Sequence, residues 1–405
     1  MKTVVIGGGA SGLIASYFAS AKGNQVVLIE KNEKLGKKLY ITGKGRCNVT
    51  NNVGVAEFLQ NVNTNHKFLH SSINAFPPSS VIDFFENNGL KLKTERGNRV
   101  FPLSDKSSDV IKCLEKALIN NNVDIRLNTT VTSIKINNDE VCGVTTDKGV
   151  IDCDNVIVCT GGVSYPLTGS TGDGYKFAKQ LNHNIIAPKP ALVGIELVGE
   201  DYKDLQGLSL KNVSFSIKRG EKVIYNDFGE MLFTHFGVSG PVVLSSSCII
   251  NKLNLSDLKV VIDLKPALDE STLDNRLIRE FTENNKKSLI NVMPALLPKS
   301  LIPLVLRRAS VSKNKCCFEI TKEERQRLIV SLKNLTFNFK KLRPIEEAII
   351  TSGGVDVLQV NPKTMESKLV KGLFFAGEVL DVDAFTGGFN LQIAFSTGFV
   401  AGKNA

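Results

Sequence analysis

Near the N-terminus, a short apolar run is followed by apolar residues at helical spacing and then by a second short apolar run. Residues 4–6 form an apolar run that stops at glycine, and residues 13–21 then repeat apolar side chains at helical spacing. A second apolar run, residues 26–29, follows Gly23-Asn24. This order predicts a strand, a glycine turn, a helix and a second, parallel strand.

The glycine turn has the spacing of a dinucleotide-binding fingerprint. Its glycines stand in a G-x-G-x-x-G register, which allows a tight turn, close backbone approach to a pyrophosphate and close helix packing. An acid that can bind a ribose diol ends the second strand. Glycine turns are common, so a purely structural βαβ unit is the alternative. The full pattern favours dinucleotide binding by Gly7, Gly9, Ala10, Ser11, Gly12 and Glu30.

Later segments extend this layout and then interrupt it. Apolar spacing predicts helices within 55–90 and at 108–120 and about 175–181, strands at 123–127 and 345–351, and a meander of strands at 130–136, 140–146 and 149–153. Residues 191–265 instead show short strands between turns, and most of 266–344 is helical in pattern. We therefore expect a cofactor domain in two parts, 1–190 and 345–405, around an insert at 191–344 that combines a β-barrel-like sheet with helices.

Composition narrows the class of protein. The chain has 405 residues, of which 42% are hydrophobic and 22% charged, as in soluble globular proteins. The uncharged stretches 3–21 and 231–251 lack the patterns of a signal peptide and a membrane span. Eight cysteines without C-x-x-C spacing and four histidines without ligand spacing argue against zinc, other metals and a disulfide framework. We therefore expect a protein of the reducing cytoplasm.

Positive charge is concentrated in one segment. The net charge is +10, and Lys286 to Arg343 alone holds fourteen Lys or Arg against three Glu. Two interpretations explain this excess of positive charge equally well. The segment is either a solvated helical face or a surface that binds a polyanion, for which nucleic acid is the first candidate.

Several glycine-rich loops point to a flavin. The turn at Gly387-Gly388 opens a final helix, whose N-terminus supplies positive potential where a reduced flavin ring carries negative charge. A basic loop with Lys44 does not fit a P-loop and is better placed against phosphates or ring. The expected FAD contacts beyond the first turn are Lys31, Lys37, Lys38, Thr42, Gly43, Gly45, Arg46, Cys47, Asn48, Thr160, Gly161, Gly162, Gly377, Glu378, Asp381, Gly387, Gly388, Asn390 and Leu391.

Four separated motifs resemble those of a known family. They are residues 43–48 (GKGRCN), 170–174 (STGDG), 232–241 (LFTHFGVSGP) and 386–392 (TGGFNLQ). Together they are similar to the BaiN/YhiN-type NAD(P)/FAD-dependent oxidoreductases along essentially the whole chain. The resemblance implies a Rossmann-type FAD domain split by a barrel-like and helical insert. It also implies a substrate among bile-acid rings, aminoacetone and uridine of ribosomal RNA.

We expect reduction of an activated C=C bond, with FAD reduced by NAD(P)H and uridine in ribosomal RNA as the favoured substrate. A small-molecule reductase or amine oxidase and a non-catalytic flavin sensor are the alternatives. No second G-x-G-x-x-G follows a strand, so nicotinamide either docks transiently or is not used. Cys47, in a basic loop that would lower the pKa of its thiol, and His235 are candidate proton donors. Each is also explained as a residue of the packed interior.

Overall fold

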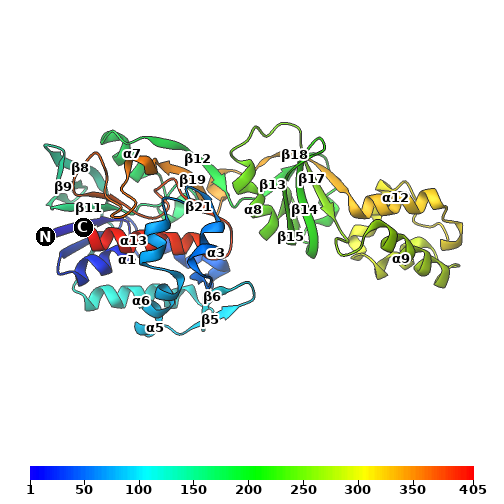
Figure 1. Cartoon of the computed structure of the whole chain (residues 1–405), viewed down its shortest axis with the longest axis horizontal. Helices are drawn as coiled ribbons and strands as arrows, with labels where there is room; N and C mark the ends of the chain where they lie inside the picture. Colours follow the sequence, from blue (N-terminus) through cyan, green and yellow to red (C-terminus); the bar gives the residue numbers. More distant parts are fainter. The chain divides into compact units, whose positions relative to one another are not determined.

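The structure, a computed structural model, describes all residues from Met1 to Ala405. The chain folds into two compact units, one made of Met1–Ala191 and Pro344–Ala405 and the other of Leu192–Arg343. Figure 1 colours the chain from blue to red, and both ends of this range lie in the first unit. The second unit is therefore an insertion in the chain of the first.

A five-stranded parallel sheet forms the centre of the first unit. Its order is β20-β11-β1-β2-β7, and every neighbouring pair is parallel. The strands are β1 (Lys2–Ile6), β2 (Gln25–Ile29), β7 (Asp124–Arg126), β11 (Asn155–Val158) and β20 (Leu373–Phe375). Strands β1, β2, β11 and β20 are almost wholly apolar and buried, as expected for a parallel sheet covered on both faces. Because β20 pairs with β11, the C-terminal part of the chain completes the sheet that the N-terminal part begins.

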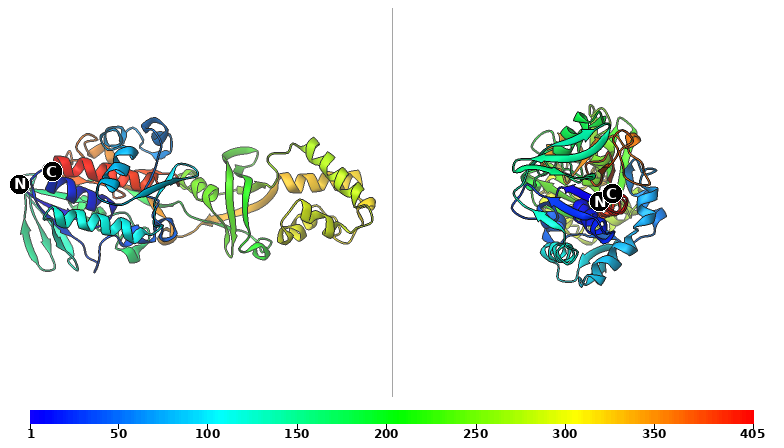
Figure 2. Two further views of the ribbon diagram at one scale, coloured as in Figure 1. Left: turned by 90° about the horizontal axis from the view of Figure 1, so that it is seen from below. Right: turned by 90° about the vertical axis from the view of Figure 1, so that its left-hand side faces the viewer.

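Two helices from opposite ends of the chain pack closely on each other in this unit. Helix α1 (Ala10–Ala21) follows β1, and α13 (Phe389–Asn404) ends the chain. A Cβ added to Gly398 would lie 2.4 Å from the carbonyl oxygen of Ser11, and one added to Gly402 would lie 2.3 Å from that of Ala15. Both pairs advance by four residues in the same direction, so the helices run parallel. Figure 2 shows the two chain ends beside each other.

The rest of the first unit surrounds this sheet and helix pair. The predicted meander is present as β8 (Val131–Asn137), β9 (Glu140–Thr146) and β10 (Gly149–Asp152). The helices are α2 (Lys37–Ile41), α3 (Val55–Gln60), α4 (His70–Ala75), α5 (Pro78–Asn87), α6 (Ser107–Asn120) and α7 (Asp173–Gln180). Smaller sheets consist of β3 (Thr50–Asn51), β5 (Leu92–Glu95) and β6 (Arg99–Pro102), of β4 (Val62–Thr64) and β21 (Asp383–Ala384), and of β12 (Ile185–Ala191) and β19 (Ile350–Val355).

The strand expected at 345–351 is shifted in the structure. Residues Ile345–Glu347 form a single 3-10 turn after Pro344, and β19 begins only at Ile350. It pairs antiparallel with β12 and does not enter the parallel sheet. The apolar run was correct as a strand signal, but a proline that starts a turn delays the strand.

The second unit contains a closed antiparallel barrel, as the strand pattern predicted. Its order is β13-β16-β15-β14-β17-β18. The strands are β13 (Ile195–Leu197), β14 (Ser209–Arg219), β15 (Lys222–Thr234), β16 (Gly237–Ser239), β17 (Leu258–Asp263) and β18 (Leu335–Leu342), and α8 (Pro241–Ile250) packs against β15. Strand β18 was assigned to the helical part from sequence. Leu335, Phe337 and Phe339 are buried at a spacing of two, which is the period of a strand.

Helices form the remainder of the second unit. They are α9 (Glu270–Glu283), α10 (Leu289–Val292), α11 (Ile302–Arg308) and α12 (Lys322–Lys333). Asp269 caps α9 by accepting a hydrogen bond from the Thr272 backbone N–H (2.7 Å), and Thr321 with Glu324 forms a capping box at α12. No helix combines the length and the apolar run needed to cross a lipid bilayer.

Candidate functional site

The first glycine turn leaves one glycine facing open space. A Cβ on Gly7 would lie 2.6 Å from the Cys159 carbonyl oxygen, and one on Gly12 would lie 1.9 Å from that of Gly7, so both glycines are needed for packing. A Cβ on Gly9 would meet nothing within 4 Å. Gly9 is the N-cap of α1 and provides no side-chain cap, so the free N–H groups of the first helical turn are available to a ligand. This arrangement is suited to a phosphate group.

An acidic side chain stands beside this turn. Glu30 follows β2, is 9% exposed, and accepts hydrogen bonds from the Gly8 backbone N–H (2.8 Å) and from Asn32. The adjacent Lys31 pairs with Asp173 (2.7 Å) and donates to Thr171. These contacts fix the carboxylate next to the phosphate-binding turn and bring the loop before α7 to the same edge of the sheet. The predicted role of Glu30 toward a ribose fits this position.

A second helix N-terminus forms where two predicted motifs meet. Gly387 and Gly388 both have positive φ (+130° and +101°), and a Cβ on Gly388 would lie 2.5 Å from the Thr50 carbonyl oxygen. Asn51 donates a hydrogen bond to the Gly387 carbonyl (3.0 Å), and Asn48 Oδ1 lies near the Gly388 position. The loop at 43–48 and the turn at 386–388 are therefore neighbours at the start of α13.

The two helix N-termini are offset along one direction. Gly398 lies level with Ser11 at the start of α1, and nine residues separate it from the first residue of α13. Because Ser11 is the second residue of α1, the offset between the two N-termini is eight residues. At 1.5 Å per residue, the N-terminus of α13 extends about 12 Å beyond that of α1, on the side of the carboxyl edge of the sheet. An extended dinucleotide requires two separated helix N-termini of this kind, because its pyrophosphate and its ring are separated by a ribityl chain.

Lys38 and Glu378 form an ion pair between the glycine-rich loop and the end of β20. The Lys38 Nζ lies 2.7 Å from Glu378 Oε2 and 2.7 Å from Ser164 Oγ. Glu378 Oε1 also accepts from Ser164 Oγ (3.0 Å) and the Thr351 backbone N–H (2.9 Å). Ser164 and Thr351 had no signal in the sequence, because their partners lie far away along the chain.

Other predicted residues have partners within the protein. Gly377 packs on the first turn of α1, since its added Cβ would lie 2.4 Å from Ser11 Oγ. Asn390 uses its amide to bind the backbone N–H and carbonyl of Ala384. Asp381 accepts a hydrogen bond from Asn65, and Thr42 donates to the Leu39 carbonyl.

Arg46 and Lys37 do not present free positive charge to a phosphate, in contrast to the expectation. The Arg46 guanidinium pairs with Glu95 and Asp105 and lies 4.1 Å from the centre of the Phe101 ring. Lys37 pairs with Glu33 at 3.2 Å. Acids that follow much later in the sequence neutralise Arg46, so its charge could not be assigned from the loop alone. In this structure both cations support the fold of the loop.

The Cys47 thiol is also different from the expectation. The residue is fully buried and has a positive φ of +58°. Burial raises the pKa of the Cys47 thiol to about 11, and a hydrogen bond with Thr42 lowers it only in part. The prediction of a lowered pKa was wrong, because burial of the thiol is the dominant cause of the shift. A thiol with this pKa is poorly suited to acid or nucleophile chemistry near neutral pH.

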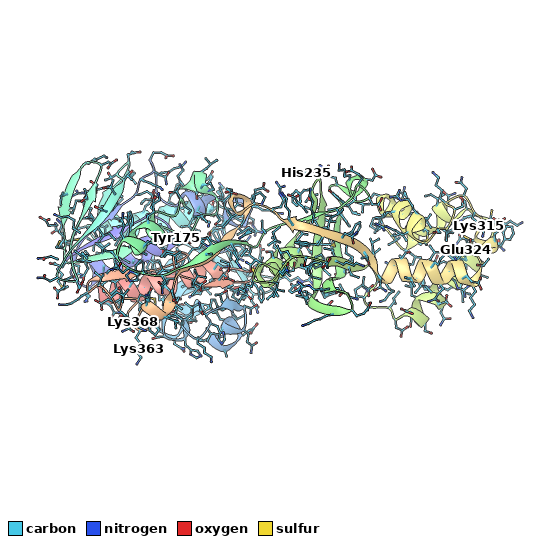
Figure 3. All side chains as sticks on the ribbon, turned by 90° about the horizontal axis from the view of Figure 1, so that it is seen from above. Tyr175, His235, Lys315, Glu324, Lys363 and Lys368 are labelled. Carbon is cyan, nitrogen blue, oxygen red and sulfur yellow. The ribbon has the colours of Figure 1, made fainter.

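His235 lies in the second unit, on the turn between β15 and β16. It is exposed, so its interpretation as an interior histidine was wrong (Figure 3). Its ring contacts Phe236 edge to face at 5.0 Å, and the Arg343 guanidinium lies 4.7 Å from the centre of the Phe236 ring. Neighbouring Gly237 and Phe233 have structural roles, at a strand crossing and in the barrel core.

Buried polar atoms without a partner test whether the first unit fits FAD. Asn48 Oδ1, Asn51 Oδ1 and Thr160 Oγ1 are buried and make no hydrogen bond within the protein. In the same unit the hydroxyl of Tyr175 (the residue is labelled in Figure 3), Ser16 Oγ, Asn155 Nδ2 and His183 Nδ1 also lack a partner. Buried polar atoms normally have partners, and of these seven the atoms of Asn48 and Thr160 belong to residues predicted to contact the cofactor. With the glycine cradle and the two helix ends, these groups fit an FAD molecule. No cluster of three or more His, Cys, Asp or Glu is arranged to hold a metal.

Ion pairs neutralise part of the basic segment. Eight of its fourteen cations pair with carboxylates: Arg307, Arg308, Lys315, Arg325, Lys333, Lys340, Lys341 and Arg343. Of the five carboxylates involved, only Glu324 belongs to the segment. The others are Glu196, Asp201, Asp263 and Asp274. The free positive charge of the surface is therefore smaller than the count along the segment.

Comparison with known proteins gives consistent matches over the whole chain. A family model described as the HI0933-like protein Rossmann domain matches residues 1–404. The 3-dehydro-bile acid delta(4,6)-reductase of Clostridium scindens is 30% identical over 405 residues, which cover 99% of this chain and 98% of that protein. The ribosomal RNA dihydrouridine synthase of Escherichia coli strain K12 is 29% identical over 404 residues, covering 99% and 97%.

Solved structures share the fold at lower identity. The 3-ketosteroid-delta4-(5alpha)-dehydrogenase from Rhodococcus jostii RHA1, in complex with 4-androstene-3,17-dione, has a TM-score of 0.54 at 14% identity. The match covers 99% of this chain and 96% of that one. At this identity the likeness extends to the fold alone.

Proposed function

The chain belongs to the HI0933-like family of FAD-dependent oxidoreductases, and from this premise we propose that it reduces an activated C=C bond with electrons from NAD(P)H. We propose uridine in ribosomal RNA as the substrate and dihydrouridine as the product. The observation that carries the proposal is the pair of parallel helices α1 and α13, whose N-termini are offset along one line. When bound, FAD supplies a hydride to the electron-poor carbon of the substrate.

The residues of the chain have distinct roles in this proposal. The first turn of α1 and Gly9 bind the pyrophosphate, and Glu30 binds a ribose hydroxyl. The N-terminus of α13 at Gly388 provides fixed positive potential, which favours negative charge on a ring bound there. The ion pair of Lys38 with Glu378 keeps the carboxylate from repelling the phosphates. None of these roles requires a side chain to move.

Reduction of a C=C bond also needs a proton at the carbon next to the one that receives hydride. We propose His235 for this role, because it is exposed and because imidazole is a common acid near neutral pH. An acid of this kind typically contributes about 10²- to 10⁴-fold in rate. His235→Asn should lower product formation in this range while leaving FAD content unchanged. Equal rates in the two proteins would exclude the role.

Two observations support an RNA substrate. The second unit has 24 Lys and Arg against 17 Asp and Glu, so most of the net charge of +10 lies in the insert. A relative that matches 99% of this chain over 97% of its own length is named as a ribosomal RNA dihydrouridine synthase. A positive insert on a flavin domain is suited to a large anionic substrate.

Nucleoside mass spectrometry of ribosomal RNA tests the substrate. RNA from cells with and without the gene should differ by loss of dihydrouridine in the deletion. Restoring the gene should restore the modification, and the His235→Asn variant should restore it poorly. An unchanged dihydrouridine level in the deletion would contradict the proposal.

A second candidate is reduction of a conjugated steroid ketone. The observation in its favour is the 30% identity to a 3-dehydro-bile acid delta(4,6)-reductase, which equals the identity to the RNA enzyme within 1%. Anaerobic mixing of the NADPH-reduced protein with a 3-oxo-4,6-diene steroid distinguishes the two. Fast reoxidation of the flavin by the steroid, with no reaction on RNA, would favour this second function.

A further inference from the structure

The helical part of the second unit contains a surface pocket outside the cofactor site. It lies between the C-terminal end of α11 and one face of α12, with a volume of about 400 Å³. Five of its residues come from α12 at helical spacing, and the sixth from α11. The lining residues are Arg308, Glu323, Gln326, Arg327, Val330 and Ser331. The pocket is shallow and open to solvent.

The lining combines two guanidinium groups with one exposed apolar side chain. Val330 is 48% exposed although it is a large apolar residue. The Arg327 Nε donates to the Ala309 carbonyl (2.8 Å), which fixes the guanidinium, and Arg327 pairs with no carboxylate. Arg308 is held by Asp201 at 2.8 Å. Glu323 is the one acid of the lining.

Some cations near the pocket form no ion pair. Arg327 and Lys322 on α12 are two of the six cations of Lys286 to Arg343 without an ion pair, and both are exposed. Arg327 thus places a guanidinium at the pocket without a direct ion pair, and its charge adds to the hydrogen bonds that lower the pKa of the nearby Glu323 and Glu324 carboxyl groups. Guanidinium groups stack on nucleobases and bind phosphates, whereas glutamine amides such as that of Gln326 can bind a base edge.

We propose that this pocket binds one unstacked nucleotide of an RNA. The base would lie against Val330 and the guanidinium of Arg327, with Gln326 bonding its edge. A free phosphate would make no use of the apolar side chain of Val330, and a steroid would make no use of the guanidinium groups. The inference rests on the proposed function for the identity of its partner, and it places RNA recognition on α12, away from the paired cations of β18.

Binding of a labelled, single-stranded, uridine-rich RNA to the FAD-loaded full chain tests the pocket. Arg327→Gln and Gln326→Ala should each weaken binding by about tenfold, as expected for loss of one stacked base. Arg279→Gln is the matched control, because Arg279 is also an exposed helical arginine of this unit and has no ion-pair partner. Flavin absorbance and the thermal unfolding midpoint should be unchanged in all three variants.

The outcomes separate this inference from the proposed function. If Arg327→Gln binds RNA as tightly as Arg279→Gln, the pocket is not the RNA site, even if dihydrouridine is formed. If NADPH or a mononucleotide binds in the pocket and displaces no RNA, the pocket does not bind an RNA nucleotide and the inference is wrong. If RNA binds through the pocket but no dihydrouridine is produced, the inference about the pocket is supported and the proposed function is contradicted. Absence of any RNA binding overturns both.

Discussion

Gly398 lies against the backbone of Ser11, so close that an added Cβ would be 2.4 Å from the Ser11 carbonyl oxygen. This contact joins the last helix of the chain to the first. It also sets the register of α13 on α1 and thereby the offset of about 12 Å between their N-termini. The site for an extended cofactor therefore depends on a packing contact between residues that are 387 positions apart in the chain.

Gly9→Ala should separate cofactor binding from folding. A Cβ at Gly9 meets no protein atom within 4 Å, and φ of −89° is open to alanine, so stability of the FAD-free protein should not change. The methyl group would occupy space beside the bound pyrophosphate. Overpacking costs about 1–3 kcal/mol, which corresponds to a rise of about 5- to 150-fold in the dissociation constant of FAD. Titration of FAD into both proteins measures this. Loss of stability without loss of affinity would contradict the assignment.

Lys38→Met should weaken FAD binding because it leaves the Glu378 carboxylate without its cation. Glu378 follows Gly377, which contacts the first turn of α1, so the free charge would repel phosphates bound there. We expect about a tenfold loss of affinity, about 1.4 kcal/mol. Adding Glu378→Gln to Lys38→Met should recover part of the loss. A double-mutant cycle without coupling between the two changes would show that the pair has no role in FAD binding.

The lowered pKa of the Asp173 carboxyl group predicts that the protein loses stability in acid. Partial burial alone would raise its pKa, but hydrogen bonds from Lys31 and Lys176 outweigh burial and hold the pKa below its ordinary value. The stabilising contribution is therefore present above about pH 4 and is lost as pH falls through the lower folded pKa. Lys31→Met should reduce the free energy of unfolding above pH 4 and have little effect in strong acid. Denaturant unfolding between pH 6 and 2 tests this, and a difference independent of pH would contradict it.

Cys47 should be unreactive in the folded protein. Burial raises the pKa of its thiol to about 11, so little thiolate is present near neutral pH. Iodoacetamide should modify the partly exposed Cys316 first and reach Cys47 only after unfolding. Peptide mass spectrometry gives both rates. Modification of the folded protein at Cys47 as fast as at Cys316 would restore the interpretation as a reactive thiol.

Local patterns in the sequence were sufficient for most of the fold. The strand, turn and helix around Gly9 and the β-meander depend on neighbouring residues, so periodicity predicted them. Gly398 and Gly402 were missed, although their spacing of four on one helix is a signal for close helix packing. Both glycines lie within the predicted final helix, but their spacing alone does not identify the helix that packs against them.

Charge and reactivity were predicted less well than the fold. Arg46 meets Glu95 and Asp105, and four of the acids that neutralise the basic segment lie outside it. Ion pairs of this kind depend on tertiary contacts, which a single sequence does not encode locally. The same holds for Cys47, because its burial and not its neighbours in the chain determines the pKa of its thiol.

The amount of flavin released from the purified, denatured protein tests the central claim most directly. Two parallel helices that hold one extended cofactor predict one FAD per chain, either as purified or after incubation with FAD. A protein that remains colourless and takes up no FAD under these conditions would contradict the account.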